Sequence, residues 1–224
     1  FLELALQPFG AASSDLNDLI TSQVVDRSGL NEQSLMDKRV VILANVPELD
    51  SNQVNALKSF VEGGGGLVVF PGDKVKIDWY HRELFREGAG LLPQEFVALA
   101  GAGSGSARDV ESTKIINQHF SHPAFAFFND PRNGKLDEAK FDHWFRLGLS
   151  DESRDRVPPS LQSEVEVIAR FDTGDPFLVE RAVGEGLVIL SAAPADAGWS
   201  NLPTQPVYLP VMQRLVTYLA ASVD

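Results

Sequence analysis

The chain of 224 residues contains no cysteine. Disulfides, thiolate nucleophiles and cysteine-ligated zinc all need that side chain, so the sequence excludes each of them. It also has no run of about 18 apolar residues, so no segment is predicted to span a bilayer. Neither a GxxxxGK[ST] phosphate loop nor a G-x-S-x-G nucleophile elbow occurs. The sequence starts at Phe1 without a Met or a signal-peptide pattern.

Basic residues are few, because 19 Lys and Arg face 31 Asp and Glu and the net charge is −12. Nucleic-acid binding needs clustered Lys and Arg to displace counterions, so we expect no nucleic-acid partner. The same charge disfavours docking on anionic lipid. It is compatible with plain solubility or with a basic protein partner. A hydrophobic content of 44% is ordinary for a globular fold, and we expect one α/β domain over residues 1–224.

The most informative stretch runs from residue 39 to residue 74. Val40–Ala44 is a continuous apolar run, which is typical of a strand covered on both faces. Asp50 stands at the capping position of a helix expected over Ser51–Glu62, and the glycines Gly63–Gly66 end it. Leu67–Phe70 is a second buried strand. The pattern predicts a parallel crossover unit with both strands adjacent and inside the sheet.

The second half of the chain shows turn signals between short apolar runs. Three strands are predicted, at Val165–Phe171, Phe177–Ala182 and Leu187–Ala192. Short glycine-containing turns separate them and predict two hairpins that extend the sheet with antiparallel strands. Pro210–Ala221 is predicted to be the last helix. Nearer the start, Gln23–Asp26 is predicted to be a short strand and Ser28–Met36 a helix.

Several stretches resemble one known family. They are VVILANVPELDSNQVNALKSFVEGGGGLVVFPGD from Val40, GAGLLP from Gly88, HP at His122, DPFLVERAVGEGLVIL from Asp175, WSNLP from Trp199 and VYLPVMQRLVTYLA from Val207. Together they resemble the class I glutamine amidotransferase-like domain of large bacterial membrane proteins. Those proteins begin with an aerotolerance-regulator (BatA-type) membrane segment and a von Willebrand factor A domain. The resemblance covers nearly the whole chain.

The resemblance implies a flavodoxin-like, glutamine amidotransferase-like α/β fold. Its sheet is mostly parallel, with helices on both faces and an antiparallel hairpin extension. In the family another strand precedes the segment that begins at Phe1, so we expect the first strand of the sheet to be missing here. The resemblance also implies a piece of a longer membrane-anchored protein, on the extracytoplasmic (periplasmic) side. Membrane contact would come only through segments outside this chain.

The family's chemistry depends on a cysteine on a tight turn after a buried strand and on a histidine from a later strand end. The matching turn here, Pro71–Lys74, holds no cysteine, and the matching later segment, Ala193–Asp196, holds no histidine. The resemblance therefore implies the fold without the activity. We expect a pseudoenzyme with no catalytic residues and no cofactor.

Candidate binding residues lie where the parallel strands are expected to end. They are Asn45, Gly72, Asp73, Lys74, Asp196 and Trp199. The carboxyl ends of parallel strands form the usual crevice of such sheets. Asp73 could act as a carboxylate nucleophile, but a turn or helix cap is the favoured role. Trp199 could line the crevice, although a loop tryptophan more often pins its loop to the core.

Two further patterns do not predict a site. His119 and His122 are three residues apart and could share a metal on a helix, but Pro123 interrupts the segment, so packing is favoured and no metal is predicted. Gly101–Ser106 has the glycines of a damaged dinucleotide fingerprint. Without the third glycine in place or an acidic residue about 20 positions on, it is predicted to be a flexible loop.

The leading hypothesis is an interaction or scaffold module that binds protein partners or other domains of the same chain. One alternative is a carboxylate-based hydrolase that uses Asp73 and Asp196. The other is a small-ligand sensor that uses the same crevice. Polar side chains converging at the strand ends would favour the alternatives, and a crevice filled by Trp199 and apolar groups would favour the scaffold.

Overall fold

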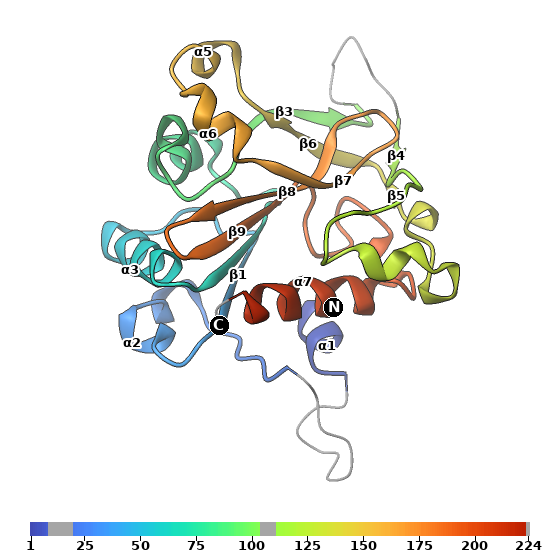
Figure 1. The fold of residues 1–224 in the computed structure, drawn as a ribbon, viewed down its shortest axis with the longest axis horizontal. Helices are drawn as coiled ribbons and strands as arrows, with labels where there is room; N and C mark the ends of the chain where they lie inside the picture. Colours follow the sequence, from blue (N-terminus) through green and yellow to red (C-terminus); the bar gives the residue numbers. More distant parts are fainter. Residues whose placement is uncertain (9–19, 104–110, 223–224) are drawn as a thin grey trace.

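The computed structural model describes residues 1–8, 20–103 and 111–222. Its centre is a five-stranded mixed sheet in the order β1-β2-β9-β8-β7 (Figure 1). The strands are β1 (Val40–Ala44), β2 (Gly66–Phe70), β7 (Glu166–Arg170), β8 (Pro176–Val183) and β9 (Gly186–Ser191). β1, β2 and β9 are parallel, whereas β8 is antiparallel to both β9 and β7. The predicted parallel core with an antiparallel hairpin extension is confirmed.

The unit β1–α3–β2 follows the sequence signals closely. α3 (Ser51–Glu62) begins where the Asp50 carboxylate accepts hydrogen bonds from the backbone N–H groups of Asn52 and Gln53, both at 2.9 Å. Gln53 Oε1 in turn accepts from the Asp50 N–H at 3.0 Å, which completes the capping box. Gly64, with φ of 107°, takes the left-handed conformation that lets the chain leave the helix. Local capping therefore fixes both ends of the crossover helix.

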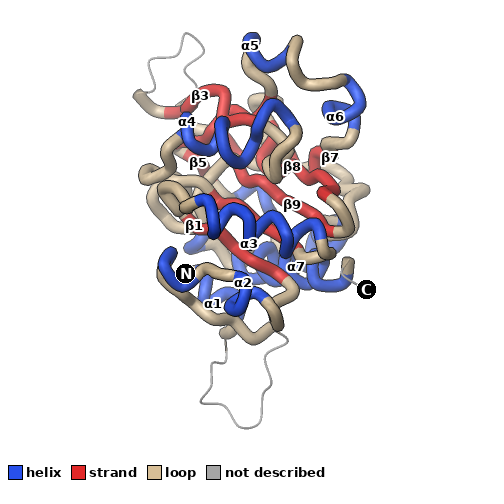
Figure 2. Tube along the Cα trace, turned by 90° about the vertical axis from the view of Figure 1, so that its left-hand side faces the viewer, coloured by secondary structure: helices blue, strands red, loops and turns tan. Residues whose placement is uncertain are grey.

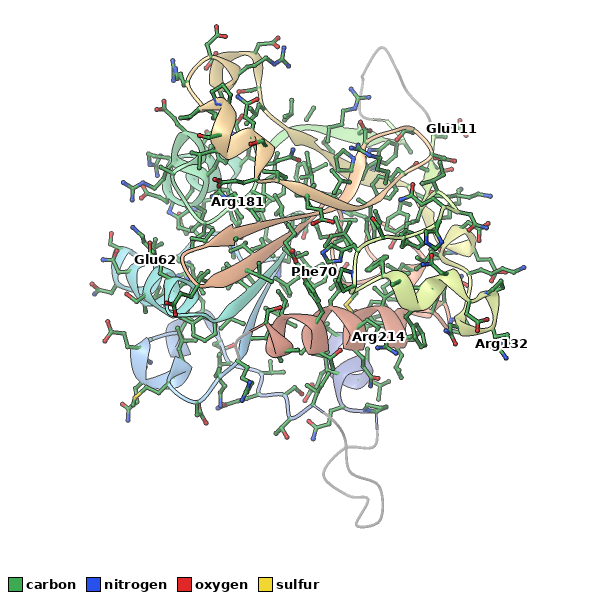
Figure 3. The ribbon with its side chains drawn as sticks, in the orientation of Figure 1. Glu62, Phe70, Glu111, Arg132, Arg181 and Arg214 are labelled. Carbon is green, nitrogen blue, oxygen red and sulfur yellow. The ribbon has the colours of Figure 1, made fainter. Side chains whose placement is uncertain are left out.

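Helices cover both faces of the parallel core. Every residue of β2 is buried. α7 (Tyr208–Ala221) lies against one face, where a Cβ built on Gly66 would come within 2.7 Å of the Leu219 Cβ. α3 lies on the opposite face (Figure 2). Phe70, the last residue of β2, points into the interior near α7 (Figure 3). Within the described ranges, no helix is both long enough and apolar enough to cross a membrane.

Smaller elements surround this core. Two short antiparallel pairs form beside it: β3 (Glu95–Gly101) with β6 (His143–Gly148), and β4 (Thr113–Lys114) with β5 (Lys140–Phe141). The short α-helices are α1 (Leu2–Leu6), α2 (Glu32–Leu35), α4 (Ile77–Trp79), α5 (Asp151–Arg154) and α6 (Pro159–Ser163). Single turns of 3₁₀-helix are η1 (Arg27–Gly29), η3 (Arg86–Gly88), η4 (Ala126–Asn129), η5 (Pro131–Asn133), η6 (Leu136–Glu138) and η7 (Leu202–Thr204), and η2 (Tyr80–Phe85) is a π-helix.

One predicted position is wrong, because β1 lies at an edge of the sheet instead of inside it. Three of its residues, Val40, Val41 and Ile42, are only partly buried, whereas β2 is buried throughout. An apolar run indicates that other layers cover both faces of the strand. It does not indicate whether another strand pairs with its outer side, so the pattern could not distinguish an edge strand from an inner strand.

Two predictions near the start of the chain are also wrong. Gln23–Asp26 forms no strand, and the Val24 side chain is 73% exposed. The helix predicted over Ser28–Met36 is limited to η1 and the four residues of α2. The break occurs at Asn31, whose side chain accepts a hydrogen bond from the Ser34 N–H at 3.0 Å and starts a new helix there.

The buried strands should dominate stability. Leu43→Ala and Val69→Ala should each lower the free energy of unfolding by about 2–4 kcal/mol, because each deletes buried methyl groups and leaves a cavity. Val24→Ala, the same chemical change as Val69→Ala at an exposed site, should stay within about 0.5 kcal/mol of the wild type. Chemical denaturation of the three variants measures this. Equal losses at positions 69 and 24 would contradict the assignment of β2 to the core.

Candidate functional site

The predicted site residues leave the sheet at one edge. β1, β2 and β9 are parallel neighbours, so their carboxyl ends lie side by side. Asn45 follows β1, residues 71–74 follow β2, and residues 192–199 follow β9. Asn45 and residues 71–74 form one group, which the hydrogen bonds of Asn45 hold together. Residues 192–199 form a second group, which hydrogen-bonds to β6.

Asn45 holds the turn after β2. Its backbone is left-handed, with φ of 52°, a conformation that asparagine tolerates better than most residues. Its Nδ2 donates to Asp73 Oδ1 at 2.7 Å, and its Oδ1 accepts from the Lys74 N–H at 3.0 Å. A Cβ on Gly72 would lie 2.4 Å from the Asn45 Cγ, so a larger residue here would displace the Asn45 side chain. The exposed Asp73 carboxylate thus serves as an acceptor within a turn.

The segment after β9 is fastened to β6 and α7. The Phe145 N–H donates to the Ala192 carbonyl at 2.8 Å. The Tyr208 hydroxyl donates to the Ala195 carbonyl at 2.6 Å. Burial, with a smaller contribution from the Asp196 carboxylate, raises the pKa of Tyr208, so the phenol remains protonated and can donate. Asp196 Oδ1 accepts from the Gly198 N–H at 2.8 Å, which makes it a turn residue as well.

Trp199 lies on β6. Its ring centroid is 5.1 Å from that of Phe145 and 6.2 Å from that of His143, and the indole is partly buried. Its carbonyl accepts from the Asp142 N–H at 2.8 Å. This arrangement corresponds to the pinning alternative for Trp199, since the ring and the backbone both tie the loop to the neighbouring strand.

No histidine side chain in the described part of the chain hydrogen-bonds to the strand-end residues. His143 is beside Trp199, but its Nε2 faces the Ala102 carbonyl at 3.0 Å and therefore donates to it. His81 lies 4.0 Å from Glu95, and His122 lies 3.4 Å from Glu180. Within the described part of the chain, no hydrogen bond or ion pair joins a histidine to Asp73 or Asp196.

A groove away from these residues is lined by other side chains. This open groove has a volume of about 730 Å³ and lies between η2 and α5, and its lining includes His81, Glu95 and Ser153. Glu95 is buried and accepts from the Ser153 hydroxyl at 2.8 Å. A second cavity of about 270 Å³ is lined by Arg181 and several apolar side chains. None of the six predicted site residues lines either cavity.

The backbone beside these cavities is unusual. Arg86 and Glu87 are both left-handed, with φ of 51° and 54°, and they directly follow the π-helix η2. The buried guanidinium of Arg181 (Figure 3) donates to the carbonyls of Gly88 and Gly90 and holds this turn from the sheet side. The predicted flexible loop Gly101–Ser106 lies partly outside the described residues, since the description stops at residue 103.

A polar cluster that the sequence did not predict lies on the α7 face of the sheet. Glu180 of β8 accepts from the Tyr218 hydroxyl of α7 at 3.0 Å and faces His122. Burial and the nearby Glu180 carboxylate raise the pKa of Tyr218, which keeps it a donor. His119 is exposed, so His119 and His122 do not share an environment. The partner of His122, Glu180, is 58 residues away along the chain.

Comparison with known proteins gives a likeness of fold. No family model and no curated protein matches the chain. Among solved structures, the cytoplasmic protein STM1381 from Salmonella typhimurium LT2 aligns with a TM-score of 0.60 at 14% identity, covering 85% of this chain and 75% of that one. The cytoplasmic protein STM3548 from Salmonella typhimurium aligns with a TM-score of 0.55 at 13% identity, with the same coverage. The chain shares its overall α/β fold with these two proteins.

One prediction is contradicted by this result. The resemblance implied an extracytoplasmic, periplasmic location, yet both proteins with the shared fold are described as cytoplasmic. The predicted location is therefore wrong. Nothing in the comparisons links the chain to a BatA-type segment or a von Willebrand factor A domain.

The turn after β2 should depend on Asn45. Asn45→Ala removes two hydrogen bonds and places alanine in a left-handed conformation, so it should lower the free energy of unfolding by about 1–2 kcal/mol. Asn52→Ala, at an exposed position whose side chain makes no such contact, should change it by less than about 0.5 kcal/mol. Thermal or chemical denaturation distinguishes the two. An Asn45→Ala variant as stable as Asn52→Ala would show that the Asn45–Asp73 contact does not order the turn.

Proposed function

We propose that this chain is a non-catalytic, amidotransferase-like domain that works as an interaction or scaffold module. The observation that supports the proposal is the state of the predicted nucleophile turn. The turn that the resemblance matches to the nucleophile turn holds Asp73 and no cysteine, and the Asn45 amide donates to the Asp73 carboxylate at 2.7 Å. A side chain held within a turn in this way stabilises backbone and is not poised for attack.

The chemistry of glutamine hydrolysis supports the same conclusion. Acyl transfer needs a nucleophile, a base within hydrogen-bond reach and donors for the developing oxyanion. Asp73 attacking an amide would form an anhydride and would still need a base to resolve it. His143, the histidine beside the β9 segment, is directed at the Ala102 carbonyl instead. The carboxylate-hydrolase alternative therefore lacks a partner group for Asp73 among the described residues.

The proposal includes a flavodoxin-like, amidotransferase-like fold for this chain. A crossover helix between adjacent parallel strands, helices on both faces and a hairpin extension are the features expected of a flavodoxin-like, amidotransferase-like domain. The overall fold that this chain shares with two proteins of known structure is compatible with this assignment. The sequence resemblance supplies the family name.

The same edge could serve recognition because its backbone is already ordered. Asn45 fixes one turn, and Tyr208 and Phe145 fix the other segment. Binding to a pre-ordered surface avoids the entropic cost of ordering a loop. With a net charge of −12, a basic protein surface is the best match in charge. The partner would be another protein or another domain of the same chain.

Ammonia release from glutamine tests the proposal. Purified protein should release no more ammonia than a buffer blank, while an active glutaminase in the same assay gives a clear signal. Turnover above the blank that disappears in Asp73→Asn would replace the scaffold proposal with the carboxylate hydrolase. Turnover that Asp73→Asn leaves unchanged would also refute it, and would place catalysis at another site.

A further inference from the structure

Three ligand-type side chains meet on the α7 face of the sheet, away from the strand-end edge. Glu166 of β7 and Glu180 of β8 are direct partners in the antiparallel ladder, so their side chains share one face. His122 reaches them from the loop before η4. One potential ligand atom from each of the three residues lies within 4.8 Å of the other two.

Glu180, one member of this cluster, has a carboxylate oxygen without a hydrogen-bond partner in the described part of the protein. Its side chain is only 7% exposed. Oε1 accepts from the Tyr218 hydroxyl, but Oε2 is buried and has no hydrogen-bond partner in the described part of the protein. No lysine or arginine within the described ranges forms an ion pair with Glu180 or Glu166. A buried carboxylate without a cation or a full set of donors is costly, so the site favours an added positive charge.

The distance between two of the groups suits a metal ion. His122 Nε2 and Glu180 Oε1 are 3.4 Å apart. A charge-assisted hydrogen bond would be shorter, at about 2.7–2.9 Å. Two ligands of a tetrahedral zinc ion, each about 2.0–2.1 Å from the metal, lie about 3.4 Å from each other. The separation is therefore long for a hydrogen bond and close to that of neighbouring metal ligands.

We propose that His122, Glu180 and Glu166 bind a divalent transition metal ion, with Zn²⁺ as the best match. One imidazole and two carboxylates are common zinc donors, whereas Ca²⁺ and Mg²⁺ prefer oxygen ligands alone. Three protein ligands leave a fourth position for water. Glu166 is exposed on the edge strand β7, so an ion can reach the two buried ligands from solvent. This role is independent of the proposed scaffold function.

The metal competes with a defined metal-free arrangement. His122 Nδ1 accepts from the Ala124 N–H at 3.3 Å, so the ring proton of neutral His122 is on Nε2 and points at Glu180. A metal ion binds Nε2 through a lone pair, so Nε2 must lose its proton. The ring proton is then on Nδ1, and the hydrogen bond from the Ala124 N–H is lost. Metal binding therefore has a signature in the tautomer of one histidine.

Isothermal titration calorimetry of the chelator-treated full chain with ZnCl₂ tests the site. One zinc ion per chain should bind saturably. Glu166→Gln removes one ligand at an exposed position and should weaken binding at least about tenfold without unfolding the protein. Glu185→Gln makes the same charge change in the exposed turn between β8 and β9 and should leave the affinity unchanged. Equal weakening in both variants would refute the site, because it would indicate general attraction to an acidic surface.

Nitrogen NMR of the imidazole provides a second readout on the same sample. The His122 resonances, assigned with His122→Gln, should change from an Nε2-protonated to an Nδ1-protonated ring with zinc on Nε2. Zinc binding that leaves the His122 resonances unchanged would place the metal elsewhere and overturn the proposal. Absence of any saturable binding would overturn it as well, and the glutaminase result would be unaffected in either case.

Discussion

The burial of β2 between α3 and α7 is the constraint on which the rest of the structure depends. Its backbone is paired with β1 on one side and β9 on the other, and all its side chains are enclosed. Gly66 lets α7 approach, since any Cβ there would collide with Leu219. With β2 fixed, the turns that leave β1, β2 and β9 are brought to one edge. The Asn45–Asp73 contact and the fastening of residues 192–199 both follow from that placement.

The sequence predicted elements whose signals are local. Asp50 stands beside the backbone groups it caps, and the glycines after Glu62 end the helix through their own conformation. The parallel pairing of the core strands was predicted correctly, but two other predictions that depend on distant partners failed. The apolar run of β1 is the same for an edge and an inner strand, and Gln23–Asp26 has strand-forming residues but pairs with no strand in the described part of the chain. Asn31 contained a usable signal, the capping pattern with Ser34, that divides the predicted helix.

Some features of the candidate site could be predicted from the sequence, and others could not. The absence of cysteine and of histidine from the two expected turns could be read directly, and it underlies the non-catalytic proposal. The Asn45–Asp73 hydrogen bond could not, because it joins residues 28 apart through a left-handed backbone. The His122–Glu180–Glu166 cluster depends on the register of β7 against β8, which is interrupted by irregularities, and on a loop 58 residues from Glu180. Neither relation leaves a periodic pattern in the sequence.

We propose that the strand-end edge is a fixed structural surface and not a glutamine site. Amide NMR during a titration with glutamine tests it most directly, since the Lys74 N–H, the Asn45 side-chain amide and the Gly198 N–H report on both turns. We expect these resonances to stay in place up to millimolar glutamine. Saturable shifts confined to residues 72–74 and 196–199 would show that the edge binds the substrate of the resembling family, and would contradict the claim.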